Sequence, residues 1–197
     1  MNYLAHIFLS GAVRKRQLGN YIGDAVKGKG YEKYPEAIAE GILFHRAIDD
    51  YTDNHPLVRE MVLELRPAFG RYSAILLDIY FDYFLASRFR LFSDTPLKLY
   101  SKNFYLTLIL NYNYLPDRIK SFMWHFITTD RLSKYAQPEG IRQSLEIMVK
   151  YRNLDISVDQ AMTYLSVHET ELFEKFMLFF SDLQLFCKQY LEKNKHY

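Results

Sequence analysis

The sequence predicts an all-α fold in a single compact domain over residues 1–197, and three observations support this prediction. Prolines recur where helices would begin. No segment shows the alternation of apolar and polar residues that is typical of a half-buried strand. Apolar residues recur at helical spacing, most clearly near the end of the chain at Leu172, Phe173, Phe176, Phe179, Phe180, Leu183 and Phe186.

Prolines and glycines define the helices expected in the first half of the chain. Pro35 opens a helix that runs to about residues 51–53. Pro56 suits the first turn of the next helix, which the Pro67–Gly70 stretch ends. Residues 72–92 are apolar enough to form one long buried helix.

The second half repeats the same signals. Pro96 and Pro116 mark further helix starts, and Asn111–Asn113 form a loop between them. A helix over residues 138–151 begins at a proline. The Ser157–Gln160 pair has the spacing of a capping box and opens a short helix, which the final aromatic helix follows.

Composition excludes several classes of protein. The chain has 197 residues, of which 49% are hydrophobic, so it can bury a sizeable core and is not disordered. Its net charge of +2 gives no reason to expect nucleic-acid binding. The single cysteine, Cys187, excludes an internal disulfide and suits a cytoplasmic protein. We expect neither a signal peptide nor a membrane span, because His6 interrupts the first apolar run and no run reaches eighteen residues.

The stretch GILFHRAIDDYTDNHP, residues 41–56, is too apolar for a solvated helix and too charged for an ordinary core helix. On a helix, His45 and Asp49 lie about 40° apart on one face. Ile42 and Ile48 flank that face at about 60° on either side. We therefore expect the imidazole and the carboxylate to project from an apolar stripe and to be buried.

Three other segments carry polar residues at the same four-residue spacing. Asp78 and Asp82 are the only charged residues of AILLDIYFDYFLA, residues 74–86. The pairs Asn20–Asp24 and Asn2–His6 repeat the pattern. If these faces converge in a helical bundle, they form a site of histidines and carboxylates that suits a divalent cation.

A purely structural interpretation stands beside this one. Asp78 and Asp82 would then form salt bridges with Arg46 or Arg71, because buried carboxylates require a cationic partner. His45 would be an ordinary core histidine that has its hydrogen bonds satisfied.

Four motifs, taken in order, resemble the bacterial acyl carrier protein phosphodiesterases. They are M-N-x-L-A-H at residues 1–6, G-N-x-x-x-D at 19–24, G-I-x-x-H-R-x-I-D-x-x-T-D-x-H-P at 41–56 and D-x-x-x-D-x-F-L-A at 78–86. The resemblance is strong over residues 1–90 and thin afterwards. It implies a helical bundle similar to the HD-domain phosphohydrolases and the removal of the 4′-phosphopantetheine arm from holo-acyl carrier protein. It also implies a divalent metal, with Mn²⁺ expected and Mg²⁺ or Fe²⁺ as alternatives.

For this chemistry we expect metal ligands at Asp24, His45, Asp49 and Asp78, with Asp49 either a ligand or a support for one. Hydrolysis also requires groups that position phosphate, water and protons. We expect His6 either to bind the metal or to protonate the leaving serine oxygen. Asp82 would orient the water or hold His45 in the right tautomer.

Arg46 and Tyr83 depart from related patterns. Arg46 follows His45 where HD-domain enzymes have an aspartate, and we expect it to clamp the phosphate. Tyr83 stands where the family often has a histidine. Since tyrosine is a poor base near neutral pH, we expect Tyr83→His to raise turnover.

The expected partner, by the resemblance, is a small and strongly acidic carrier protein. Basic residues near the candidate site in sequence would steer it, although the run at residues 14–16 is also typical of a solvated turn. These residues are Arg14, Lys15, Arg16, Lys27, Lys29 and Lys33. The alternatives are a phosphohydrolase acting on nucleotides or small phosphoesters, a non-catalytic carrier-binding protein, and a structural helical domain.

Overall fold

The computed structural model describes residues 2–152 and 154–194, and that part of the chain contains helices and no strand, which confirms the all-α prediction. Five short 3-10 helices, η1 to η5, join or extend the α-helices. The α-helices are α1 (Tyr3–Leu9), α2 (Arg14–Ile22), α3 (Glu36–Asn54), α4 (Pro56–Phe69), α5 (Ser73–Ser87), α6 (Leu97–Leu110), α7 (Asp117–Thr128), α8 (Arg131–Lys134), α9 (Pro138–Arg152) and α10 (Val158–Lys193).

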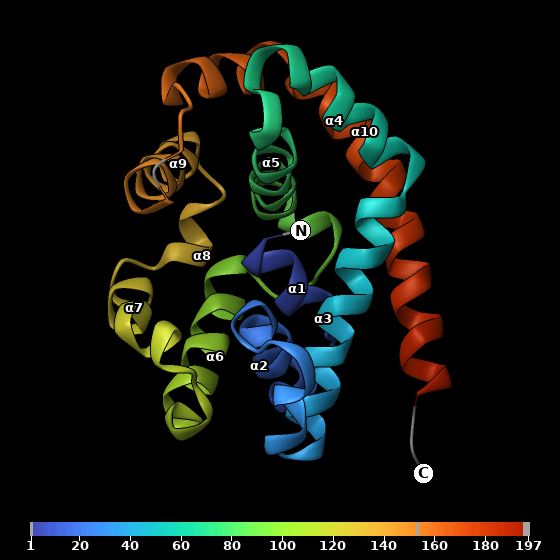
Figure 1. The fold of residues 1–197 in the computed structure, drawn as a ribbon, viewed down its shortest axis with the longest axis vertical. Helices are drawn as coiled ribbons and strands as arrows, with labels where there is room; N and C mark the ends of the chain where they lie inside the picture. The colour runs from blue at the N-terminus through green and yellow to red at the C-terminus, as the bar shows by residue number, and fades with distance from the viewer. Residues whose placement is uncertain (1, 153, 195–197) are drawn as a thin grey trace.

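Helix α5 lies at the centre of the molecule, and the other helices surround it (Figure 1). It contacts α1, α4, α9 and α10. Most of its side chains are buried, including residues on every side of the helix. A helix that is apolar all round is stable only when neighbours cover all of it, which explains its central place.

Helices α3, α4 and α10 form one wall of the fold, with α10 running along the outside (Figure 1). Aromatic pairs hold α10 in place: Phe44 stacks on Tyr190 with ring centroids 5.3 Å apart, and Tyr51 stacks on Phe186 at 4.4 Å. Helices α6 to α9 lie on the opposite side of α5 (Figure 1). No helix among the described residues combines the length and the hydrophobicity that a membrane crossing requires.

Several predicted bounds are confirmed, and others are wrong. Helices α4 and α9 begin at the predicted prolines, and Ser157 caps α10 by accepting a hydrogen bond from the Gln160 amide at 3.2 Å. Helix α4 ends at Phe69, directly before Gly70 as predicted, but it continues through Pro67.

The predicted helix over residues 72–92 ends earlier, at Ser87, and a separate 3-10 helix follows over Phe89–Leu91. The two helices expected after Ser157 form one helix of 36 residues. No proline or glycine interrupts residues 158–193, so nothing in the backbone breaks the helix. The basic run at residues 14–16 opens α2 and is not a turn.

Candidate functional site

The candidate site lies where α2 crosses α3 at unusually close range. A Cβ atom on Gly19 would lie 2.0 Å from the carbonyl oxygen of Ile38, and one on Gly41 would lie 2.3 Å from that of Arg16. Only glycine permits the two backbones to approach this closely. As a result, Asn20 on α2 reaches the ring of His45 on α3.

Two buried histidines form the centre of the site. His6 comes from α1 and His45 from α3, and their side chains are 3% and 8% exposed. The rings stack with centroids 4.0 Å apart and planes 25° apart. Gly23 lies against the second ring, because a Cβ atom there would lie 2.3 Å from Cγ of His45.

Asn20 fixes which nitrogen of each histidine carries a proton. Its Oδ1 accepts hydrogen bonds from Nδ1 of His6 at 2.7 Å and from Nδ1 of His45 at 3.2 Å. Its Nδ2 donates to Oγ of Ser10 at 2.8 Å, and that hydroxyl donates to the carbonyl oxygen of His6 at 2.8 Å. Since the hydroxyl proton is used on the carbonyl, Ser10 accepts from the amide, which orients Oδ1 toward the rings. Both histidines are therefore protonated at Nδ1.

The Nε2 atoms of both histidines consequently face a carboxylate. Nε2 of His6 lies 3.1 Å from Oδ1 of Asp49, and Nε2 of His45 lies 3.1 Å from Oδ2. Oδ1 of Asp24 lies 3.5 Å from Nε2 of His45. His6, His45 and Asp49 each offer one ligand atom, and these three atoms lie within 4.8 Å of one another. No hydrogen-bond donor from residues 2–152 or 154–194 reaches either Nε2.

If both histidines are neutral, the lone pairs on their Nε2 atoms face the lone pairs on the carboxylate oxygens of Asp49. A neutral histidine protonated at Nδ1 presents a lone pair at Nε2, and an ionised carboxylate presents only acceptors. Such a cluster needs a proton or a metal cation between its members. Imidazole and carboxylate ligands suit Mn²⁺, Fe²⁺ and Zn²⁺, so the residues present fit a divalent metal.

The pKa values show how burial and the contacts within the cluster act on each group. Burial works against the charge on His45, but contacts with Asp24 and Asp49 outweigh it and raise the pKa to about 9. Burial and the neighbouring His45 lower the pKa of His6 to about 4. Burial opposes the charge of Asp49, yet the two histidines hold its pKa far below the usual range. The contact with His45 also lowers the pKa of Asp24.

Asp82 contacts the backbone of α1 just before His6, and this differs from the expectation for it. Both its oxygens accept hydrogen bonds from α1, from the Leu4 amide at 2.9 Å and the Ala5 amide at 3.0 Å. The carboxylate thus binds the N-terminal end of α1, where unpaired amides favour a negative charge. Burial nevertheless raises its pKa to about 7. Asn20, and not Asp82, contacts Nδ1 of His45.

Asp78 lies one turn earlier on α5 and is half-buried. Burial raises its pKa, and the charges of Asp49 and Asp53 act in the same direction. It is therefore close to the cluster electrostatically, although it does not belong to the three residues whose ligand atoms meet. Its predicted role as a metal ligand stays a prediction.

Arg46 and Tyr83 make hydrogen bonds with residues other than the two histidines. Nη2 of Arg46 donates to the carbonyl oxygens of Val26 at 3.0 Å and Gly28 at 2.7 Å. The hydroxyl of Tyr83 donates to Glu169 on α10 at 3.2 Å. The geometry therefore gives Arg46 a contact other than the expected phosphate clamp, and it separates Tyr83 from proton transfer at the cluster.

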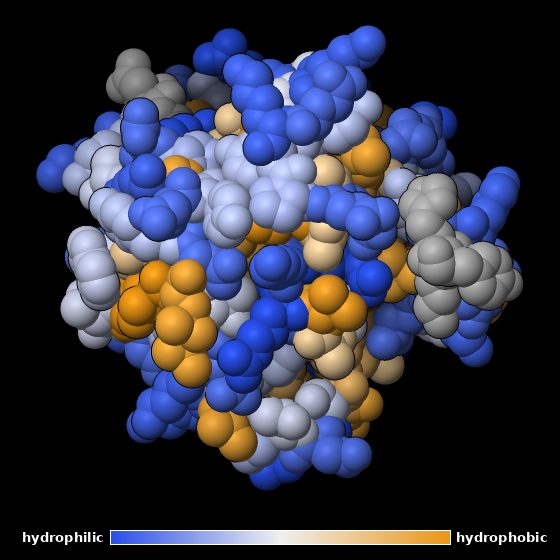
Figure 2. Space-filling model, turned by 90° about the horizontal axis from the view of Figure 1, so that it is seen from below, coloured by the Kyte–Doolittle hydropathy of each residue, from blue (hydrophilic) through white to orange (hydrophobic). Residues whose placement is uncertain are grey.

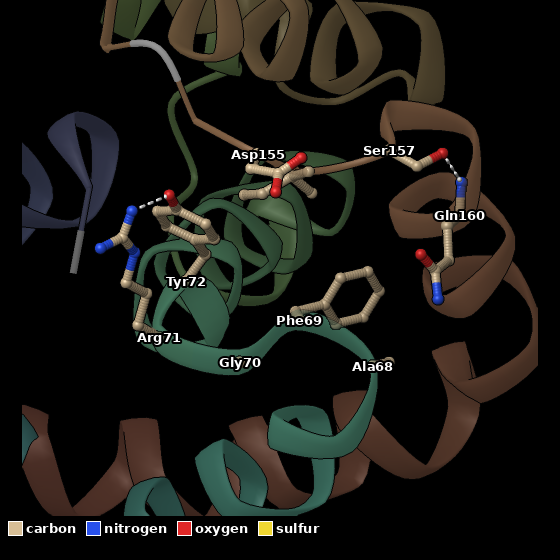
Figure 3. A pocket seen from close by; sticks show the side chains of 9 residues that line it. Ala68, Phe69, Gly70, Arg71, Tyr72, Asp155, Ser157 and Gln160 are labelled. Atoms are coloured by element: carbon tan, nitrogen blue, oxygen red, sulfur yellow. Dashed lines mark hydrogen bonds between the residues drawn. The ribbon is translucent and has the colours of Figure 1, made fainter.

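A pocket of about 310 Å³ lies at a different place, between the α4–α5 turn and the segment that leads into α10 (Figure 3). Arg71 lines it and donates to the hydroxyl of Tyr72 at 2.6 Å (Figure 3). The arginines that the structural interpretation paired with Asp78 and Asp82 thus make other contacts. None of the predicted site residues lines this pocket.

The structure adds two residues that the sequence did not single out. Ser10 orients the Asn20 amide, and Gly23 makes room for His45. Gly23 falls on an unspecified position of the G-N-x-x-x-D motif, so only its place between Asn20 and Asp24 was a signal. Ser10 carried no such signal, because only the packing of α1 against α2 brings it to Asn20.

Fold and site together define a class: an all-helical protein with a buried cluster of histidine and aspartate built from α1, α2 and α3. The chain matches the family described as acyl carrier protein phosphodiesterase over residues 1–183. It belongs to this family, and the family expectation from the four motifs is confirmed.

Three relatives that are similar to most of the chain carry the same name as the family, acyl carrier protein phosphodiesterase. The protein from Yersinia pestis is 28% identical over 91% of this chain and 94% of its own length. The protein from Shigella boydii serotype 18 is 30% identical over 91% and 94%. The protein from Escherichia coli O6:H1 is 32% identical over 79% and 72%. No solved structure matches the chain.

Proposed function

We propose that this protein is a phosphodiesterase that hydrolyses holo-acyl carrier protein to apo-carrier and 4′-phosphopantetheine, with a divalent metal ion held by His6, His45 and Asp49. The activity follows from membership of the family and from the names of the relatives. We propose Mn²⁺ as the first choice of ion. A cytoplasmic location is part of the same proposal, because a single cysteine fits a reducing compartment.

The observation that carries the metal proposal is the fixed tautomer of the two histidines. Asn20 accepts the Nδ1 proton of each ring, so in both rings Nε2 is the nitrogen that faces Asp49 and would bind an ion once it is unprotonated. A histidine that serves only the core would have a partner of its own, whereas here the single carboxylate of Asp49 faces Nε2 of two rings. Hydrogen bonds of this kind to the far nitrogen are typical of metal-bound histidines, where they fix the ring and increase its basicity.

Each residue of the site then has a task in hydrolysis. When bound, a divalent ion lowers the pKa of water and neutralises charge that develops on the phosphoryl oxygens. His6, His45 and Asp49 hold it, and Asn20 orients the two rings. Asp24, whose side chain is 66% exposed, stands at the mouth of the site. In this proposal Asp24 adds a further ligand or holds the attacking water.

The overall reaction needs no other reactant than water. Water attacks the phosphorus, the bond from phosphorus to the serine oxygen breaks, and the serine oxygen takes up a proton. Because burial and His45 keep His6 unprotonated near neutral pH, His6 suits metal binding better than proton donation. We therefore favour the ligand role of the two roles expected for it.

The test measures metal and activity on the same protein. Wild type is stripped with chelator, loaded with Mn²⁺, Mg²⁺ or Fe²⁺, and assayed by the intact mass of holo-acyl carrier protein. We expect loss of the arm only with metal, and loss of both metal and activity in His45→Gln. His125→Gln is the matched control, because His125 is exposed on α7. Full activity in chelator would refute the metal role, and cleavage of a nucleotide panel but not of the carrier would favour the alternative substrate class.

A further inference from the structure

A short basic segment lies beside the candidate site. After Asp24 the chain passes through Lys27 and the 3-10 helix η2, Gly28–Lys33, which packs against α3. Lys27, Lys29 and Lys33 are exposed, and Glu32 is the only acidic residue among residues 27–33. We call residues 27–33 the basic segment.

The basic segment is held in a defined position. Arg46 donates to the carbonyl oxygens of Val26 and Gly28, and its guanidinium lies over the ring of Tyr31 at 5.5 Å from the centroid. Val26, which leads into the segment, is buried, and Tyr31 within it packs against the core, so the segment is anchored while its lysines face solvent. Arg46 directly follows His45 on α3. The helix that supplies a predicted ligand therefore also fixes the segment.

The other basic residues occupy a different place. Arg14 and Lys15 begin α2, whereas Asp24 follows its end, and about 12 Å of helix axis separates the two ends. Arg16 is already paired with Glu40 at 3.7 Å. The end of the molecule that carries α2 and the start of α3 is largely hydrophilic, with hydrophobic side chains in separate small patches (Figure 2). Its surface suits a charged partner better than an apolar one.

We propose that the basic segment is the docking surface for the acidic protein that carries the phosphodiester, and that Arg46 is a positioning residue for this surface. The inference rests on the proposed function, because it places the carrier beside the cluster where its arm would be cut. It assigns docking to Lys27, Lys29 and Lys33, and it assigns none to Arg14 and Lys15. A positively charged rim acts mainly on the rate of association.

The experiment compares two double charge reversals with the same change in net charge. Lys27→Glu/Lys29→Glu tests the basic segment, and Arg14→Glu/Lys15→Glu is the matched control. Each is assayed with holo-acyl carrier protein and with bis(p-nitrophenyl) phosphate, a small diester that needs no docking. Direct binding of holo-acyl carrier protein to each variant is measured as well.

For the Lys27/Lys29 variant we expect kcat/KM with the carrier to fall at least tenfold at low salt, and by a much larger factor than with the small diester. The difference should shrink as salt rises, since charges are screened over about 8 Å at physiological ionic strength. The Arg14/Lys15 variant should lose less than twofold. Equal losses in the two double variants, or equal losses on the two substrates, would overturn the assignment.

Substitutions of Arg46 provide a second, independent test. Arg46→Gln removes the donors to both carbonyl oxygens, so it should raise KM for the carrier with little change in kcat, and Arg46→Lys should restore part of the effect. A phosphate clamp would instead lower kcat on both substrates. If wild type cleaves neither substrate with any metal, the proposed function fails, and the binding measurement still decides the docking surface. Wild type that does not bind the carrier overturns both.

Discussion

Gly23→Ala is the sharpest test of the geometry around His45. A Cβ atom at this position would lie 2.3 Å from Cγ, 2.5 Å from Cβ and 2.7 Å from Cδ2 of His45. Carbon atoms in contact prefer a separation of about 3.5–4.0 Å, so the ring must move by roughly 1.2 Å or more. The stacked ring of His6, 4.0 Å away, limits where it can go.

The backbone itself gives no reason for glycine at this position. Gly23 has φ −51° and ψ −43°, which alanine adopts readily. Metal–ligand distances tolerate about 0.2 Å, so a shift of roughly 1.2 Å removes His45 as a ligand. We expect the dissociation constant for Mn²⁺ to rise at least about 100-fold, which exceeds the 10- to 100-fold typical of lost supporting contacts.

The assay is the gain in unfolding free energy on adding Mn²⁺, measured by urea unfolding in chelator and in metal. At a concentration about 100 times the wild-type dissociation constant, wild type gains about 2.7 kcal/mol. A 100-fold weaker site gains only about 0.4 kcal/mol at the same concentration. Gly30→Ala is the matched control, because its Cβ would meet only Val26 Cγ1, at 3.1 Å. A wild-type gain in Gly23→Ala would refute the assignment of His45, provided that circular dichroism shows both variants folded.

Four further outcomes follow from the site. Asn20→Ala should weaken Mn²⁺ binding about 10- to 100-fold by calorimetric titration, and unchanged affinity would contradict its role. Because His45 has a pKa of about 9 without metal and must lose its proton to bind one, Mn²⁺ affinity should rise about tenfold per pH unit from pH 6 to 9 and then level off, whereas a flat profile would exclude this ligand. Asp82→Ala should lower the free energy of unfolding by roughly 2–4 kcal/mol, since it strands two buried amides, and should leave metal stoichiometry unchanged. Tyr83→His should leave kcat within about twofold, because this position faces Glu169, and a large gain would restore the expectation from the sequence.

Helix starts were predictable because they depend on local chemistry. Proline fixes φ and lacks an amide proton, which suits the first turn of a helix, as at Pro56 and Pro138. Helix ends were less predictable. Pro67 lies inside α4, and the boundary expected after the Ser157 cap does not exist. These ends depend on packing against neighbours, which local sequence does not encode.

The same distinction holds for the site. The four-residue spacing placed His45 and Asp49 on one face of α3, and they meet at 3.1 Å as that periodicity requires. The spacing of Asp78 and Asp82 was equally clear, but it could not show which helix each carboxylate faces. Asp82 faces the amides of α1, 77 and 78 residues away in sequence. The sequence predicts which residues share one face of a helix, whereas the helix that this face contacts depends on the tertiary fold.

The histidine tautomers link the fold to the proposed chemistry. A single acceptor oxygen on Asn20 serves two Nδ1 donors, from helices that are far apart in sequence. Its orientation depends on Ser10, and its position depends on the glycine contact between α2 and α3. The cluster of His6, His45 and Asp49 is therefore built by the fold before any ion arrives. A site assembled in this way loses little entropy on binding a cation, because its ligands are already ordered.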